Sequence, residues 1–333
     1  METEISSASP FLTEKTVSNI KLLCDVARSN GSSLSIRDLI LLTSMDSTED
    51  QLIESWKNNE ELSSEYEIQS GFIMEKGGHD VSSGADNDYA ESLEREKQEI
   101  SERYLRATSN ASYARRFGSF IGGRVFKVLA ISGSTSYFSV SKEDDLDFFC
   151  IAESGKMWKG LVKSLLLARV FRIAEKNSPW LCLSYVSDEK FARSELAENQ
   201  DGLFARDAIS ARTVFGEQYY ISLLRENSWM AHYFPKLYNL RVGETKSAEL
   251  DPKGESSIQR IVNQFLYYTA GSYIKIKSHL LNRKFMKNGK ISSLFVLRIG
   301  PDHCIYESMD YVKLRKLYAG LKKTEPVQST VSQ

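Results

Sequence analysis

The spacing of apolar residues in the first 76 positions changes from a helical period to a strand-like one. Apolar side chains at three- and four-residue steps predict a helix over residues 14–30 and further short helices at 33–44 and 47–62. The stretch "YEIQSGFIMEKG" then predicts a two-stranded hairpin with Ser70-Gly71 at its turn. Three helices followed by a hairpin is the order of a winged helix, so we expect a winged-helix-like module over residues 14–76.

A polar segment and a long charged helix follow this module. Residues 77–89 are rich in Gly, Ser and Asp, which predicts a loop or linker. Sparse apolar positions between 90 and 123 predict a long helix that breaks near Ser109-Asn110 and packs on the next domain through its later part. We therefore expect residues 77–110 to form a linker and a helix.

The middle of the chain alternates between strand and helix patterns. Apolar runs at 125–134, 146–154 and 179–187 predict strands, and a helical period separates the second strand from the third. Strand, turn, strand, helix, strand is the order of a mixed α/β layer. Residues 189–231 are expected to be helical.

The last part of the chain is basic. Residues 236–323 hold 17 Lys and Arg against 7 Asp and Glu. A helical pattern covers residues 255–286, and residues 290–300 fit a short strand or a helix end. We expect a basic helical region over 236–318 and a disordered tail over 319–333.

Charge is distributed unevenly along the chain. Residues 1–104 hold 22 acids and 9 bases, whereas residues 105–333 hold 22 acids and 34 bases. A basic half suits an anionic ligand such as a nucleotide or a nucleic acid, and docking of the two halves on each other is the other interpretation. An acidic N-terminal module is badly placed to approach phosphate, so we expect it to dock protein rather than DNA.

Composition and the N-terminal residues indicate a cytoplasmic protein. The four cysteines stand far apart and form no CxxC pair, so neither a disulfide framework nor a zinc site is expected. The first residues lack the apolar segment of a secretory signal. No apolar run approaches the roughly 20 residues of a membrane helix, so we expect no membrane partner.

The stretch "LAISGSTSYFSVSKEDDLDFFCIA" carries the strongest candidate chemistry. Gly133 and Ser134 follow one predicted strand, and their backbone N–H groups and hydroxyl can cradle a phosphate. Asp145 and Asp147 begin the next strand, and residues two apart point to the same face. Two carboxylates so close repel unless a cation lies between them, and Mg²⁺ or Mn²⁺ accepts both carboxylate and phosphate oxygens. Asp144 is expected to face away from this pair.

The motif "SGSTSYFSVSKEDDLDFF" resembles the G-S-x(n)-D-x-D pattern of the nucleotidyltransferase superfamily that includes DNA polymerase beta. More closely, the chain resembles prokaryotic nucleotidyltransferase-domain proteins that carry an N-terminal winged-helix-like module. The similarity continues in "LCLSYV" and "LFARDAISARTVFGEQYY". It implies an α/β (α+β) protein whose mixed sheet, flanked by helices, occupies residues 111–235, with a C-terminal helical region after it.

The resemblance also implies roles for individual residues. Gly133 and Ser134 would hold a nucleoside triphosphate (NTP), and Asp145 and Asp147 would bind Mg²⁺ or Mn²⁺. The implied reaction transfers a nucleoside monophosphate to a hydroxyl or phosphate acceptor with release of pyrophosphate, and the acceptor (small molecule, protein or RNA) stays open. The superfamily usually has a third catalytic carboxylate on a later strand. The strand at 179–187 contains none, so Asp188 at its end is the candidate, and an inactive fold that binds nucleotide or protein is the alternative.

Three further groups of residues each allow two interpretations. The first two either line the phosphate site or form ordinary solvated or paired surfaces. They are Lys156, Lys159 and Lys163, and Arg206, Asp207 and Arg212. The third group mixes tyrosines with bases between residues 263 and 287, as a nucleic-acid surface with stacked bases does. An amphipathic core helix has the same pattern, and we expect the core helix.

Overall fold

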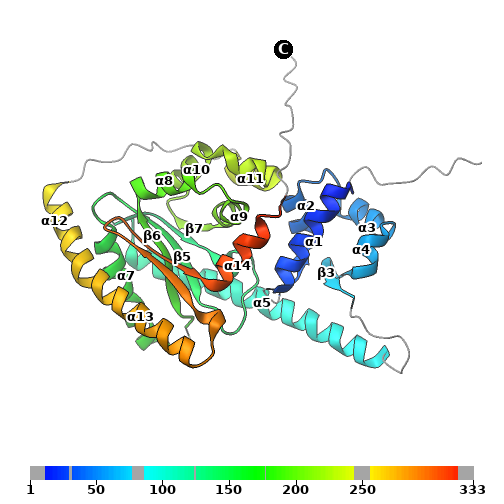
Figure 1. Ribbon diagram of the computed structural model, residues 1–333, viewed down its shortest axis with the longest axis horizontal. Helices are drawn as coiled ribbons and strands as arrows, with labels where there is room; N and C mark the ends of the chain where they lie inside the picture. The colour runs from blue at the N-terminus through cyan, green and yellow to red at the C-terminus, as the bar shows by residue number, and fades with distance from the viewer. Residues whose placement is uncertain are drawn as a thin grey trace, which may run out of the picture. The chain divides into compact units, whose positions relative to one another are not determined.

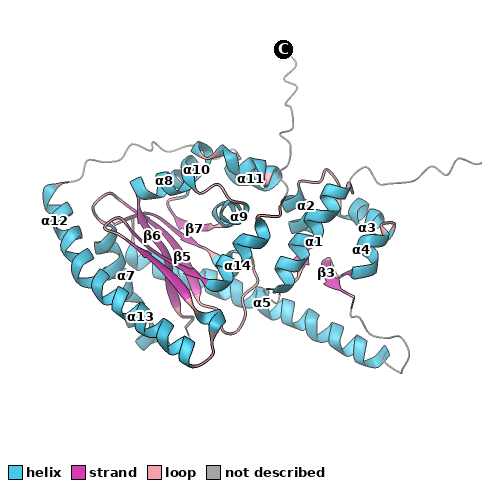
Figure 2. Ribbon diagram, in the orientation of Figure 1, coloured by secondary structure: helices cyan, strands magenta, loops and turns pink. Residues whose placement is uncertain are grey.

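The computed structural model describes residues 12–29, 32–76, 86–123, 125–176, 178–243 and 256–321. The chain divides into two compact units. One holds the residues up to Ile100 with Trp229–Leu240 and the segment from Leu317 onward, and the other holds Ser101–Ser228 and Arg241–Lys316. Helices and strands are mixed throughout (Figure 1, Figure 2), so the protein is of a mixed α/β type compatible with α+β.

The first unit combines helices with a small antiparallel sheet. Its elements are α1 (Glu14–Ser29), β1 (Leu34–Ser35), α2 (Ile36–Thr43), α3 (Glu49–Lys57), α4 (Glu60–Glu65), β2 (Tyr66–Gln69) and β3 (Phe72–Glu75). The expected hairpin is present, with Ser70 and Gly71 both at positive φ, and β1 pairs with β3 as a third strand. The single helix expected over 47–62 is two helices, because the Asn59 side chain caps α4 and starts a new helix there.

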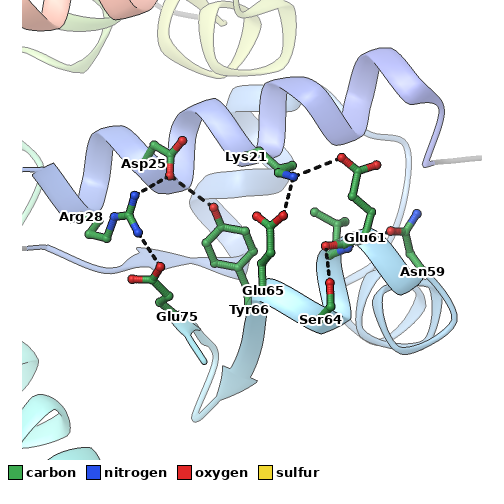
Figure 3. A network of polar contacts seen from close by, with 10 residues as sticks. Lys21, Asp25, Arg28, Asn59, Glu61, Ser64, Glu65, Tyr66 and Glu75 are labelled. Atoms are coloured by element: carbon green, nitrogen blue, oxygen red, sulfur yellow. Dashed lines mark hydrogen bonds and ion pairs between the residues drawn. The ribbon is translucent and has the colours of Figure 1, made fainter. Parts of the chain in front are cut away.

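Ion pairs join α1 to α4 and β3 (Figure 3). Lys21 Nζ lies 3.2 Å from Glu61 Oε1 and 2.7 Å from Glu65 Oε1, and Arg28 Nη1 lies 2.5 Å from Glu75 Oε1. Exposed pairs of this kind contribute about 0–1 kcal/mol each, so buried apolar contacts stabilise the unit more than these pairs do. The pairs do neutralise part of its acidic surface.

The second unit is built on a six-stranded mixed sheet. Its strands are β4 (Phe126–Ile131), β5 (Leu146–Ala152), β6 (Leu181–Asp188), β7 (Arg212–Phe215), β8 (Phe295–Ile299) and β9 (His303–Ser308). They lie in the order β7-β4-β5-β6-β9-β8, in which β5 and β6 are parallel and every other neighbouring pair is antiparallel. The strands predicted at 125–134, 146–154 and 179–187 are therefore present as β4, β5 and β6.

The other strands of this sheet correct two predictions. The stretch 189–231, expected to be helical, contains β7, and the basic region 236–318, expected to be helical, contains β9. β8 lies within residues 290–300, for which a short strand was one of the two expectations. β7 pairs with β4, and β9 pairs with β6. β7 and β9 are stabilised by strands far away in the sequence, so no local apolar pattern predicts them.

The long helix α5 (Asp86–Ile121) also departs from expectation, because it runs without a break through Ser109-Asn110. The Asn110 side chain is buried, and its Nδ2 donates to the Thr135 hydroxyl at 3.4 Å. Asn110 therefore anchors α5 to the segment after β4 instead of ending the helix. The boundary expected between residues 110 and 111 lies inside this helix.

Helices cover both faces of the sheet. In the second unit they are α6 (Gly133–Ser136), α7 (Met157–Ala174), α8 (Glu189–Glu198), α9 (Gly202–Ser210), α10 (Glu217–Glu226), α12 (Ser257–Leu266) and α13 (Ser272–Lys287), with the π-helical turn η2 (Tyr267–Gly271) joining the last two. Helices α11 (Pro235–Val242) and α14 (Met309–Tyr318) have residues in both units. Leu146 and Phe148 of β5 enter one core cluster with α5 and α7, whereas Phe149 faces the other way and contacts Tyr220 of α10.

Within the described ranges, no helix is long and apolar enough to cross a membrane. The four cysteines are free thiols, as expected. Most of the linker predicted at 77–89 and of the tail predicted at 319–333 lies outside the described residues.

Candidate functional site

The turn after β4 lies directly against the second residue of β5. The Ser132 amide donates to the backbone oxygen of Asp147 at 3.0 Å. Gly133 follows with φ +61° and begins α6, and a Cβ atom added to it would lie only 2.7 Å from Asp147 Oδ2. A residue with a Cβ would be strained at this φ and would displace the Asp147 carboxylate, so glycine suits this position. The structure therefore brings together the predicted phosphate turn and one of the predicted carboxylates.

Asp145 and Asp147 occupy different environments at the start of β5. Asp145 is exposed immediately before the strand, and Asp147 is half-buried as the second residue of the strand. Burial raises the pKa of Asp147 to about 7; hydrogen bonds from Cys182 and Ser184 lower it in part, and the charge of Asp145 raises it. The pKa of Asp145 is also raised. Neighbouring protein atoms displace part of the water around its carboxylate, and the charge of Asp144 contributes further. Like charges at close range thus add to both shifts, from Asp145 at Asp147 and from Asp144 at Asp145.

Asp144 has a separate, local role. Its carboxylate accepts hydrogen bonds from the Ser141 amide at 2.8 Å and from the Ser141 hydroxyl at 2.7 Å. These bonds close the loop that precedes β5. Asp144 therefore shapes the approach to Asp145 and is not part of the carboxylate pair.

Asp188 does not join the pair. Because β5 and β6 are parallel, their register places Cys182 beside Asp147 and Asp188 beside Ala152, at the opposite end of the strands. The Asp188 carboxylate caps α8 by accepting hydrogen bonds from two amides of its first turn, at 3.0 and 2.9 Å. The candidate third carboxylate is a helix cap, and the error arose from its position at the end of β6, which is remote from the start of β5.

The position beside Asp147 on β6 is occupied by a thiol and a hydroxyl. Burial raises the pKa of Cys182 well above its ordinary value, and the charge of Asp147 adds to this effect, so Cys182 stays a thiol that donates to Asp147. Within the described part of the chain, no group of three or more His, Cys, Asp and Glu is placed to hold a metal ion. Mg²⁺ is commonly held by one or two carboxylates together with waters and substrate phosphates. The two carboxylates fit such an ion, but not one that needs a full set of protein ligands.

The segment after α6 is held from two sides. The Tyr137 hydroxyl donates to the half-buried carboxylate of Asp207 on α9, and the Arg206 guanidinium lies over the Tyr137 ring at 4.4 Å. Phe138 has φ +56°, and the Arg212 guanidinium of β7 lies 3.9 Å from the centre of its ring. The three residues proposed from the sequence to line the site are therefore near it, where they fix the segment that carries the phosphate turn.

Trp180, which the sequence analysis did not single out, lies near the two carboxylates. Its backbone oxygen accepts from the Leu146 amide at 2.7 Å, which places it at the same edge of the sheet as Asp145. The side chain is 62% exposed, and the Arg172 guanidinium lies 4.3 Å from its ring. The sequence does show that Trp180 comes directly before the apolar run of β6. The residue before a strand lies at the edge of the sheet where that strand begins, so this position could have indicated its place near Asp145.

The lysines of α7 are not part of the site. α7 follows β5, so Lys156 and Lys159 lie near the end of that strand opposite Asp147. Lys156 pairs with Glu153, and Lys163 Nζ donates to the Ile121 backbone oxygen at 3.0 Å. The ordinary interpretation of these lysines is the correct one.

No family model matches the chain, and comparisons with curated proteins and with solved structures also found no match.

Proposed function

We propose that the second unit is a metal-dependent nucleotidyltransferase that moves a nucleoside monophosphate from an NTP to an acceptor. The contact between Gly133 and the Asp147 carboxylate is the observation that carries the proposal, because it sets a phosphate-binding turn against a carboxylate suited to a divalent cation. The six-stranded mixed sheet is compatible with a nucleotidyltransferase fold. We further propose that residues 14–76 form a winged-helix-like module that docks protein, and that the protein is cytoplasmic.

Each residue of the site then has a defined task. The amides of Gly133 and Ser134 and the Ser134 hydroxyl bind phosphate oxygens of the NTP, and Asp145 and Asp147 hold Mg²⁺ or Mn²⁺. The ion neutralises charge on the phosphates. An acceptor oxygen forms a bond to the α-phosphorus while the bond between the α-phosphorus and its bridging oxygen breaks, and pyrophosphate leaves. The proton of a hydroxyl acceptor passes to solvent. Trp180 offers an exposed aromatic face to the nucleobase, which is compatible with any base because each has a π-face.

The acceptor is defined only by chemistry. It supplies a hydroxyl or a phosphate oxygen, on a small molecule, a protein or an RNA. The experiment that tests the proposal therefore presents all three classes together, in a cell extract. NTPs labelled in the α-phosphate are incubated with the purified protein, the extract and Mg²⁺ or Mn²⁺, and transfer of label to an acceptor is followed.

The variants Asp145→Asn and Asp147→Asn are expected to lose about a hundredfold or more of the transfer rate, because the charge that holds the ion is gone. Asp188→Asn is the matched control: it removes a carboxylate at the other end of the sheet, and Asn still caps a helix. Equal transfer by wild type and by both site variants would contradict the proposal. Equal loss in Asp188→Asn would show that the effect is not specific to the site.

The second candidate is a nucleotide-binding module without catalysis. It is favoured by one observation, which is that Cys182 rather than a carboxylate lies beside Asp147. In this case the protein binds NTP with Mg²⁺ and transfers no label to any acceptor. Calorimetric titration with NTP, run beside the transfer assay, distinguishes the two candidates.

A further inference from the structure

Helix α12 turns an apolar stripe toward solvent. Ile258, Ile261, Val262 and Phe265 follow one another at helical spacing and are all exposed, with Ile261 68% and Phe265 65% accessible. The opposite side of the helix holds it to the second unit, because Asn263 Oδ1 accepts from the Trp158 amide at 2.8 Å. A surface helix normally buries its apolar stripe. In α12 the stripe is unpartnered among the described residues.

Helix α13 shows the same arrangement, which corrects the expectation of a core helix between residues 263 and 287. Its inward positions are few and include Ile274 and Ser278. Tyr273, Ile276 and Leu280 are exposed on its outer side. The exposed tyrosine and aliphatic side chains therefore form a surface, not a core.

Helix α7 adds a third apolar stripe next to these two. Leu166, Val170 and Ile173 are exposed at spacings of four and three residues. α12 contacts α7, and α7, α12 and α13 all contribute to one core cluster on one face of the sheet (Figure 1). We call the exposed apolar side chains of α7, α12 and α13 the outer helical face. Exposed apolar surface on this scale marks a contact with a protein or with a membrane.

The charges of these helices are all of one sign. Residues 157–174 of α7 contain four Lys and Arg and no Asp or Glu, and residues 257–287 contain six Lys and Arg and no Asp or Glu. Two copies of the chain that met through this face would bring like charges together with no acid on it to neutralise them. Charge complementarity therefore selects an anionic partner.

The kind of apolar side chain on this face indicates which anionic partner fits it, a nucleic acid or a lipid surface. A single-stranded nucleic acid stacks its bases on aromatic rings, and it offers little to aliphatic side chains. The exposed residues of α7 and α12 are mainly Leu, Ile and Val. An anionic lipid surface accepts both components, because aliphatic and aromatic side chains enter the boundary of the acyl chains while Lys and Arg bind the headgroups.

We propose that the outer helical face binds an anionic membrane surface, with α7, α12 and α13 lying against the headgroups. Lys277 and Lys284, exposed on α13, bind lipid phosphates, and Ile261 and Phe265 of α12 insert beside them. The proposal goes beyond the proposed function and does not depend on it. The absence of a membrane-spanning segment led to the expectation of no membrane partner, but binding at a lipid surface needs no such segment.

The test is co-sedimentation of the full chain with vesicles of phosphatidylglycerol and phosphatidylcholine, compared with vesicles of phosphatidylcholine alone. The wild type is expected to bind the anionic vesicles and to lose binding as salt rises. Lys277→Gln with Lys284→Gln should lower the partition constant about fivefold per lysine, and Ile261→Gln with Phe265→Gln about tenfold or more. Val296→Gln, at an exposed apolar position on strand β8, is the matched control and should keep wild-type binding.

Several results would overturn the proposal. One is the absence of binding to anionic vesicles at low salt, and another is equal loss in Val296→Gln. A dimer seen by light scattering that dissociates in the Ile261→Gln, Phe265→Gln variant, without vesicle binding, would make this face an interface between copies. Binding of a single-stranded oligonucleotide that is lost in the lysine variant, again without vesicle binding, would make it a nucleic-acid surface. All substituted residues are exposed, so circular dichroism is expected to show intact folds.

Discussion

Gly133 and Asp147 are in direct contact, with no room for even one carbon atom between the turn of one strand and the carboxylate of the next. The contact is reinforced by the bond from the Ser132 amide to the Asp147 backbone oxygen. The turn at Gly133 and the Asp147 residue are therefore held together by a side-chain contact and a backbone hydrogen bond, so a displacement of either one is expected to displace the other.

Gly133→Ala is expected to abolish nucleotide binding and to destabilise the protein. A left-handed backbone costs a residue with a Cβ about 1–2 kcal/mol, and the clash with Asp147 adds to that cost. Gly122→Ala is the matched control, because Gly122 has φ +64° and no atom within 4 Å of the added Cβ. Urea unfolding should show a larger loss of stability in Gly133→Ala than in Gly122→Ala, and NTP titration should show loss of binding in Gly133→Ala alone. The same behaviour in both variants would show that the contact with Asp147 is unimportant.

Trp180→Ala is expected to weaken NTP binding about tenfold while leaving tripolyphosphate binding unchanged. Stacking of a base on an aromatic side chain contributes about 1–3 kcal/mol, and tripolyphosphate has no base to stack. Trp180→Phe should restore most of the affinity. Calorimetric titration with the two ligands is the measurement, and an equal loss for both would assign Trp180 a structural role.

Asp188→Ala is expected to lower the free energy of unfolding by about 1 kcal/mol, because α8 loses the side chain that caps its first amides. Asp188→Asn should retain nearly all of the stability, since Asn caps helices well. Neither variant should change the rate of nucleotidyl transfer per folded molecule. A variant of Asp188 that keeps its stability but loses nucleotidyl-transfer rate would show that Asp188 takes part in catalysis.

The half-buried carboxyl of Asp207 predicts an unusual dependence of stability on pH. Burial raises its pKa to about 6, against the lowering effects of the Tyr137 and Tyr311 hydroxyls and Arg206, while Asp201 raises it. The folded state therefore holds this proton more tightly than the unfolded state, and stability falls as pH rises from about 4 to about 6. The loss is about 3 kcal/mol, from about two pKa units at about 1.4 kcal/mol each.

Chemical unfolding of wild type and Asp207→Asn across this pH range tests the prediction. Asn does not titrate, so the difference between the two proteins should move in favour of the variant by about that amount as pH rises. A constant difference would mean that Asp207 is ionised in the folded protein throughout the range.

The features that the sequence predicted correctly are those that local patterns determine. β4, β5, β6 and the Ser70-Gly71 hairpin follow from apolar runs and turn residues, and the meeting of Gly133 with Asp147 follows from strand ends that share an edge. β7 and β9 escaped prediction because their pairing with β4 and β6 supplies the stabilisation that their few residues lack. Asp188 was misplaced because strand direction, which the sequence does not state, decides which end of β6 lies beside Asp147.

The pairing of β6 with β9 affects how the protein is made. Tyr185 of β6 pairs with Ile305 of β9, so during synthesis the edge of β6 stays unpaired until the residues of β9 have been made. Exposed strand edges recruit other strands, and contacts between residues distant in sequence form slowly. A nascent chain of this protein therefore passes through a period in which it is most prone to aggregate. A protein shortened before residue 303 lacks β9, so the edge of β6 would stay unpaired and the protein would stay prone to aggregate.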